Sequence, residues 1–192
     1  MSVGVGLVCA DRSGIVHETN NTDTDDMTDI PRLNGIIGAL ENGGHAFSAF
    51  VPMDVQTAVT ISGSRYDGVV YEGEHLPWDP VGLRDALQFM IDRRAVVASG
   101  SVAPHVTPFA RVPVNGVEMG QWHAKQALDT GCYGIVWPHI STVEEAYNAV
   151  AACRYPRLKD KPLYEPQGIR GDGPVRAARY WGITQQEYYQ RA

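Results

Sequence analysis

Short apolar runs alternate along the chain with longer segments in which apolar residues recur at helical spacing. Four runs rich in Val, Ile and Phe are strand candidates, at residues 46–51, 68–72, 107–112 and 134–138. An order of strand, helix, strand, helix predicts parallel strands with helical crossovers, in either a doubly wound sheet or a (β/α) barrel. The pattern alone leaves both architectures open.

Helix signals lie between and around these runs. Asp79 is a good N-cap before Pro80, and the apolar residues that follow repeat on one helical face. Further helices are predicted at residues 31–42 and after Thr184, which has Glu187 three positions later. The face predicted to be buried in the helix after Asp79 consists of Leu83, Ala86, Leu87, Met90 and Ile91.

Another helix is predicted after the fourth run. Ser141, Thr142, Val143 and Glu144 have the pattern of a capping box. The residues predicted to be buried on one side of this helix are Val143, Ala146, Val150 and Cys153.

Two phosphate-binding signatures of doubly wound sheets do not occur in the sequence. No GxGxxG follows the first strand candidate, and no GxxxxGK[ST] occurs anywhere. This favours the barrel, although a complete barrel ordinarily takes about 250 residues and eight strands. The chain has 192 residues and four strand candidates, so the length does not match a whole barrel.

The charge divides the chain into two parts. Residues 1–30 hold six acidic residues and one arginine, which accounts for −5 of the formal net charge of −6. Residues 18–29 are almost wholly polar, so we expect an acidic, disordered extension over residues 1–30. Residues 31–192 are expected to form one α/β domain. Because this remainder is nearly neutral, a nucleic-acid-binding surface is not predicted.

The sequence also predicts where the protein is located. No stretch approaches the ~20 consecutive apolar residues of a membrane helix, and no basic residue precedes the apolar opening of the chain. Cys9, Cys132 and Cys153 are widely spaced, which fits neither a disulfide framework nor a zinc site and predicts reduced, packed thiols. We therefore expect a cytoplasmic protein without membrane contact.

Candidate reactive residues follow the strand candidates, because barrels and open α/β sheets gather such groups at the carboxyl ends of strands. His75 has Glu72 and Glu74 nearby, which suits a general base. Arg111 ends the third run and could hold a carboxylate or polarise a carbonyl group. His75 and His139 could equally be structural histidines, and Arg111 could equally be a salt-bridge partner.

A glycine-rich segment, GIRGDGPVRAAR at residues 168–179, must adopt special backbone conformations or approach another group closely. It is a weak candidate for a phosphate cradle, because no capped helix follows at once. A rigid turn that leads to a further strand is the alternative.

Four motifs follow one another along the chain. They are YEGEHLPWD at 71–79, PFARVPVN at 108–115, ALDTGCYGIVWPHISTVEEA at 127–146, and RYP with GIRGDGPVRAARYWG within 154–182. Their order and spacing resemble the HpcH/HpaI family of aldolases, over roughly residues 34–182.

The resemblance implies a (β/α)8 TIM barrel, of which this chain supplies about the first four β/α units. It further implies a divalent-metal-dependent aldolase that cleaves or forms 4-hydroxy-2-oxo acids through a pyruvate enolate. His75 matches the family's catalytic base, and Arg111 matches the arginine that stabilises the enolate. Asp129 matches an acidic residue that raises the basicity of that histidine, and Glu72 stands where relatives commonly have Asp.

The family's metal, which is Mg, Mn or Co, is held by a Glu and an Asp beyond the GIRG segment. Both positions would lie beyond Ala192, so the 192 residues alone are expected to be inactive. The expected partners are a small-molecule 2-oxo acid, an aldehyde, and either further copies of the chain or a complementing chain. The alternative is a non-catalytic barrel fragment that acts as a binding or assembly module.

Overall fold

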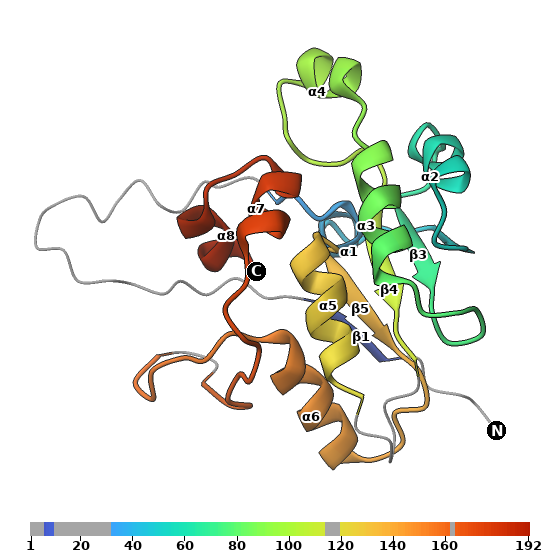
Figure 1. Cartoon of the computed structure of the whole chain (residues 1–192). Coiled ribbons are helices and arrows are strands. Elements are labelled where there is room, and N and C mark those ends of the chain that lie inside the picture. Colours follow the sequence, from blue (N-terminus) through green and yellow to red (C-terminus); the bar gives the residue numbers. More distant parts are fainter. Residues whose placement is uncertain (1–5, 10–31, 114–119, 162–163) are drawn as a thin grey trace, which may run out of the picture.

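A computed structural model describes residues 6–9, 32–113, 120–161 and 164–192, and its five strands form one sheet in the order β1-β5-β4-β3-β2. The strands are β1 (Gly6–Cys9), β2 (Ser48–Val51), β3 (Gly68–Glu72), β4 (Thr107–Arg111) and β5 (Gly134–Trp137). β2 to β5 run parallel, and β1 lies antiparallel to β5 (Figure 1). All four predicted strands are therefore confirmed.

Helices follow each parallel strand. α2 follows β2, α3 and α4 follow β3, α5 follows β4, and α6 follows β5. The helices are α1 (Gly35–Glu41), α2 (Val55–Ser62), α3 (Pro80–Phe89), α4 (Arg93–Ser99), α5 (Trp122–Thr130), α6 (Val143–Cys153), α7 (Val175–Trp181) and α8 (Gln185–Arg191). Along the sheet, α2 contacts α3, α3 contacts α5, and α5 contacts α6. This succession of β/α units confirms a partial (β/α) barrel.

Burial of the strands explains why their sequences are continuous apolar runs. Every residue of β3 and β5 is buried, as is every residue of β4 except Arg111. Parallel strands that are covered on both faces need apolar side chains at successive positions. β2 lies at the edge of the sheet and alternates exposed with half-buried residues.

Two predicted helix starts are confirmed. The Asp79 carboxylate accepts hydrogen bonds from the backbone N–H groups of Val81 and Gly82, with Pro80 at the first helical position of α3. α8 begins with the predicted capping box, in which Thr184 pairs with Glu187.

The start of α6 lies one residue later than predicted. Its capping box joins Thr142 to Glu145, so Ser141 is not the N-cap. The predicted buried face holds at Cys153 but is wrong at Val143, which is 88% exposed, and at Ala146, which is exposed as well. The buried residues of α6 are Ala149, Ala151, Ala152 and Cys153. Only the carboxyl-terminal half of α6 is packed, so an apolar residue in its first turn faces solvent.

α1 covers the amino ends of the parallel strands. The Asn34 side chain caps α1 at Ile37 and donates a hydrogen bond to the Tyr133 carbonyl oxygen just before β5 (3.3 Å). The Gly35 N–H donates to Oγ1 of Thr107, the first residue of β4 (2.9 Å). The opposite, carboxyl end of the sheet is the end at which the sequence predicts reactive groups.

α7 and α8 pack against the end of α5. Trp181 donates an indole hydrogen bond to the Gly131 carbonyl oxygen (2.8 Å), and its ring stacks on Tyr133 (4.0 Å between centroids). Gly131 has φ +123°, and a Cβ there would lie 2.5 Å from the Tyr180 ring, so glycine is required. The glycine-rich segment 168–179 runs into α7, which has no side-chain cap, and no strand follows it among the described residues.

Gly6–Cys9 lie within the extension that was expected to be disordered. In the structure they form β1, which pairs with β5. The remainder of that expectation, for residues 1–5 and 10–30, lies outside the described residues. Cys132 and Cys153 are buried, as predicted for packed thiols. Within the described part of the chain, no helix is long and apolar enough to cross a membrane.

Candidate active site

Glu72 ends β3 and organises the turn that follows it. Its Oε1 accepts hydrogen bonds from the backbone N–H groups of Glu74 (2.6 Å) and His75 (3.1 Å). Burial alone would raise the pKa of Glu72, but hydrogen bonds from Arg111 and from these two N–H groups outweigh burial and lower the pKa. Glu72 is therefore held as a carboxylate, and it fixes the backbone that carries His75.

Arg111 lies directly beside Glu72, because the two residues are paired in the register of β3 and β4. Nε of Arg111 donates to Glu72 Oε1 (3.1 Å), and Nη2 donates to Oε2 of the same carboxylate. Nη1 contacts Glu74 Oε2 (3.0 Å), and the guanidinium lies 4.5 Å from the centre of the Phe50 ring. Among the described residues, these contacts engage all three guanidinium nitrogens but not all five of their N–H donors, which leaves donors for a substrate oxygen.

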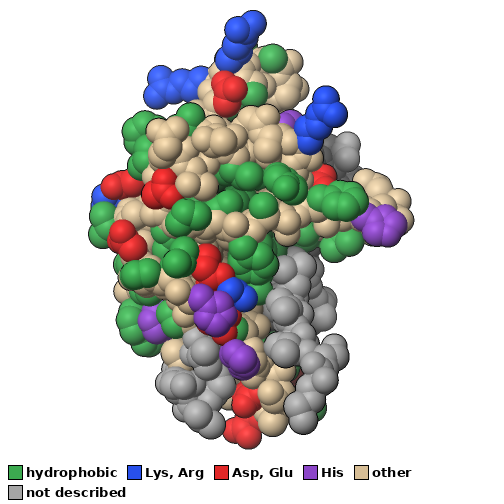
Figure 2. All heavy atoms as spheres, turned by 90° about the vertical axis from the view of Figure 1, so that its right-hand side faces the viewer, with side chains coloured by type: hydrophobic (Ala, Val, Ile, Leu, Met, Phe, Trp, Pro, Cys, Tyr) green, Lys and Arg blue, Asp and Glu red, His purple; other side chains and the backbone are tan. Residues whose placement is uncertain are grey.

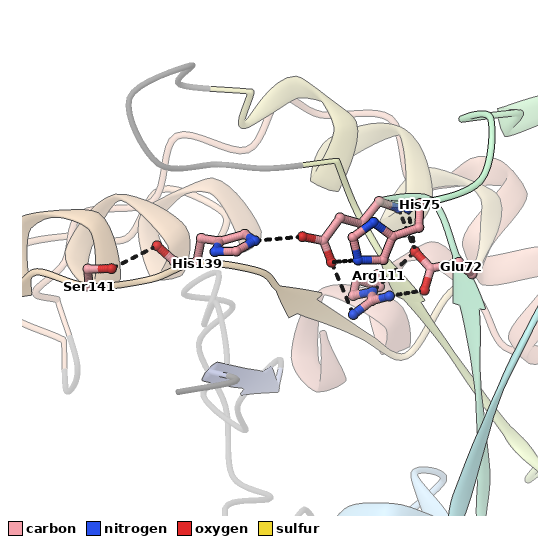
Figure 3. A network of polar contacts seen from close by, with 6 residues as sticks. Glu72, His75, Arg111, His139 and Ser141 are labelled. Atoms are coloured by element: carbon pink, nitrogen blue, oxygen red, sulfur yellow. Dashed lines mark hydrogen bonds and ion pairs between the residues drawn. The ribbon is translucent and has the colours of Figure 1, made fainter. Parts of the chain in front are cut away.

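Glu74 contacts Arg111 and two histidines, His75 and His139, and Figure 3 shows how these three side chains gather. Its side chain is 5% exposed. Oε1 lies 3.0 Å from His139 Nε2, and Oε2 lies 3.5 Å from His75 Nε2. The sequence placed Glu74 near His75 but gave no sign that it also meets His139.

The two imidazole rings reach the surface from different strand ends. His75 follows β3 with its side chain 72% exposed, and His139 follows β5 with its side chain 57% exposed. Figure 2 shows histidine side chains beside basic and acidic ones on one side of the molecule. The site therefore has two accessible imidazoles that lie against two carboxylates and one guanidinium.

Asp129 lies away from this network. It sits near the end of α5, five residues before β5 begins, whereas His75 follows the carboxyl end of β3. The two residues therefore lie towards opposite ends of the parallel strands. Asp129 instead accepts a hydrogen bond from Arg170 (3.0 Å), and burial raises its pKa while Arg170 offsets part of that effect. The structure does not bring Asp129 to His75 within one chain.

The described residues do not form a metal centre. Among them, no group of three or more His, Cys, Asp and Glu side chains is arranged to hold a metal ion. Both site glutamates are already engaged by Arg111. The residues present therefore do not fit the divalent ion that the family resemblance implies.

The network is suited to proton transfer beside a developing negative charge. An exposed imidazole next to a carboxylate can accept or release a proton near neutral pH. A guanidinium with two remaining donors can stabilise an oxyanion. These are the two demands of cleaving a carbon–carbon bond next to a carbonyl group.

No protein-family model matches the sequence, but individual proteins do. The hydroxypyruvate/pyruvate aldolase of Roseobacter denitrificans is 32% identical over 142 residues, which are 73% of this chain and 46% of that protein. The 4-hydroxy-2-oxovalerate aldolase of Rhodococcus jostii is 33% identical over 151 residues, 78% of this chain and 49% of that protein.

A solved structure supports the same fold. The HpcH/HpaI aldolase from Desulfitobacterium hafniense superposes with a TM-score of 0.58 at 17% identity, over 81% of this chain and 51% of that one. The structure of citrate synthase SbnG superposes with a TM-score of 0.51 at 26% identity, over 75% of this chain and 49% of that one.

Fold and sequence similarity together show that the chain is related to (β/α)-barrel aldolases. More narrowly, it is a homologue of the HpcH/HpaI aldolases, as its ordered motifs indicated. The chain spans about half the length of the curated relatives that it matches.

Proposed function

We propose that this chain carries the amino-terminal half of a 4-hydroxy-2-oxo acid aldolase, which cleaves its substrate to pyruvate and an aldehyde. The observation that supports this most directly is the position of Arg111 and His75, on two buried glutamates at the carboxyl edge of the sheet. The substrate class, the divalent metal and the assembly of this aldolase all belong to the proposal.

In this proposal His75 acts first as a base. It removes the proton from the substrate's 4-hydroxyl group, and the C4–O bond becomes a carbonyl as the C3–C4 bond breaks. The electrons of that bond form the C2–C3 double bond of the pyruvate enolate. Arg111 donates its remaining N–H groups to the negative oxygen on C2. Glu72 acts by orienting Arg111 and the backbone at His75.

A divalent ion, Mg²⁺, Mn²⁺ or Co²⁺, would stabilise the enolate in a complete enzyme of this kind. The described residues do not hold such an ion, so its ligands would come from elsewhere in the assembled protein. Further copies of the chain, or a complementing chain, would then complete the site. A cytoplasmic location also stays a prediction.

The alternative is a binding or assembly module without catalytic activity. Two observations favour it: the described residues hold no metal centre, and β2 is an edge strand with no neighbour on its outer side among the described strands. In that case His75 and Arg111 would be remnants of an enzyme.

The test combines mass and activity on the same purified chain. Sedimentation gives the oligomeric state, and pyruvate release from a 4-hydroxy-2-oxo acid is followed with coupled lactate dehydrogenase, with and without Mn²⁺. Metal-dependent release supports the aldolase, whereas a stable 21.0 kDa species that releases no pyruvate supports the module.

Two variants test the assigned roles wherever release is observed. His75→Ala should lower kcat about 10²-fold or more, the usual effect of losing a general base. Arg111→Lys should be comparably harmful, because an ammonium cannot reproduce the planar contacts of a guanidinium. Unchanged turnover in either variant removes that residue from the mechanism.

A further inference from the structure

One carboxylate, that of Glu74, lies between two imidazoles that come from different β/α units. The shorter of its two contacts is to His139 (3.0 Å), and the longer is to His75 (3.5 Å). A distance of 3.0 Å is a normal hydrogen-bond length, whereas 3.5 Å is at its limit. The better-formed carboxylate–imidazole pair therefore belongs to His139.

The backbone of His139 supports a specific role for its ring. Its φ of +58° is the left-handed conformation, which is unfavourable for a residue other than glycine. The Ser141 hydroxyl donates a hydrogen bond to the His139 carbonyl oxygen (3.3 Å), and the imidazole reaches back to Glu74 (Figure 3). Unfavourable backbone conformations of this kind cluster at active sites.

Each histidine places its Nε2 within ion-pair distance of the same carboxylate, that of Glu74. Both rings are more than half exposed, which lets a substrate reach them. The charged groups in this network, besides the two histidines, are Glu72, Glu74 and Arg111.

We propose that His139 is a second acid–base residue of this site, coupled to His75 through the carboxylate that both contact, Glu74. The inference rests on the proposed aldolase function, because aldol cleavage needs two proton transfers. His75 takes the hydroxyl proton while the C3–C4 bond breaks. His139, in its cationic form, then gives a proton to C3, the enolate electrons form the new C3–H bond, and the C2 carbonyl is restored. Because both rings are more than half exposed, His75 releases its proton to water and His139 takes a new proton from water, so protons and electrons balance.

The first experiment needs no aldolase activity. The histidine Cε1–H resonances of the full 192-residue chain are followed by NMR as a function of pH. Coupled groups titrate as a pair, so His139→Asn should change the shape of the His75 titration curve. Asn is chosen because it tolerates the left-handed backbone conformation at position 139 better than most residues do. Glu74→Gln should change both curves.

The matched control is His105→Asn. His105 precedes β4, at the opposite end of the sheet, and hydrogen-bonds to the Ser64 carbonyl oxygen (2.9 Å). This variant should leave the curves of His75 and His139 unchanged. A His75 curve that is the same with and without His139 overturns the coupling.

The second experiment separates the two proton transfers. With Mn²⁺ present, exchange of the C3 hydrogens of pyruvate with D₂O reports the transfer at carbon, and pyruvate release from a 4-hydroxy-2-oxo acid reports the complete cleavage. His139→Asn should lower C3 exchange about 10²-fold, the usual effect of losing an acid or base. The ratio of exchange to cleavage should fall in His139→Asn and rise in His75→Asn.

The outcomes distinguish this inference from the function on which it rests. Exchange that persists in His139→Asn but disappears in His75→Asn overturns the role of His139 and leaves the aldolase intact. Absence of both exchange and release in an assembly of the unaltered chain that binds Mn²⁺ contradicts the aldolase, and with it the catalytic role of His139. The coupling through Glu74 is then still decided by the titration curves.

Discussion

Glu72 makes the stability of the site depend on pH. Its pKa is lowered, so the folded chain favours the carboxylate more than the unfolded chain does. The resulting stability is present above the ordinary glutamate pKa of about 4.3 and is lost as the pH falls through the lowered value. Glu72→Gln should therefore destabilise the fold at pH 7 by about 1–2 kcal/mol. The expected loss is smaller than the about 3–5 kcal/mol lost when one partner of a fully buried ion pair is removed, because Glu74 still contacts Arg111.

Urea unfolding between pH 7 and pH 3 measures this effect. The difference between the original chain and Glu72→Gln should shrink towards the acid end of the range. Glu41→Gln is the control, because the Glu41 side chain is 52% exposed and its pair with Arg32 should contribute at most about 1 kcal/mol. A difference for Glu72 that does not depend on pH would contradict the ion pair.

Asp129 can be assigned a structural or a catalytic role by one substitution. The Arg170 side chain is fully buried, and the partners of its Nη2 are Asp129 (3.0 Å) and the Tyr188 hydroxyl (2.9 Å). Asp129→Asn leaves a buried guanidinium without a charged partner, so we expect a loss of about 2–4 kcal/mol in unfolding free energy. Normal stability combined with lost pyruvate release would instead favour the catalytic role that the resemblance implies.

At the scale of the elements, the cap of α6 is open to a direct test. The Thr142 hydroxyl accepts a hydrogen bond from the Glu145 N–H, and the Glu145 side chain accepts one from the Thr142 N–H. Thr142→Ala should cost about 1 kcal/mol of stability, measured by thermal or urea unfolding. Ser62→Ala is the control, because that exposed hydroxyl bonds only within its own helix turn. Equal effects would exclude the capping box as the cause.

The elements also show what a sequence can predict here. Strands buried on both faces have continuous apolar runs, so β3, β4 and β5 were recognisable. Four helices were not predicted: α5 and α7 have no side-chain hydrogen bond at the N-cap, and α2 and α4 do have one, from Asp54 and Asp92, but were still missed. Glu72, His75 and Arg111 could be found because each stands at or just beyond a strand end. The contact of Glu74 with His139 joins residues 65 positions apart through the sheet, and no local pattern encodes it.

At the scale of the whole molecule, one side of the sheet carries unusual apolar exposure. Figure 2 shows apolar side chains across the side of the molecule on which α2 and α3 lie. The exposed apolar residues on β2, α2, α3 and the segment before β2 are Phe47, Phe50, Val59, Val81 and Phe89. An edge strand beside such a surface is a ready site for pairing with another chain.

We therefore expect the chain to self-associate through this side of the sheet. Phe47 is 66% exposed and immediately precedes β2, so Phe47→Lys places a charge at the edge without removing a core residue. Sedimentation equilibrium should show a mass above 21.0 kDa for the original chain and a shift towards 21.0 kDa for this variant. Val97→Lys is the matched control, because Val97 is 82% exposed on α4 and should leave the mass unchanged. A monomeric original chain, or equal effects of both lysines, would mean that the edge of β2 does not mediate association between copies of this chain.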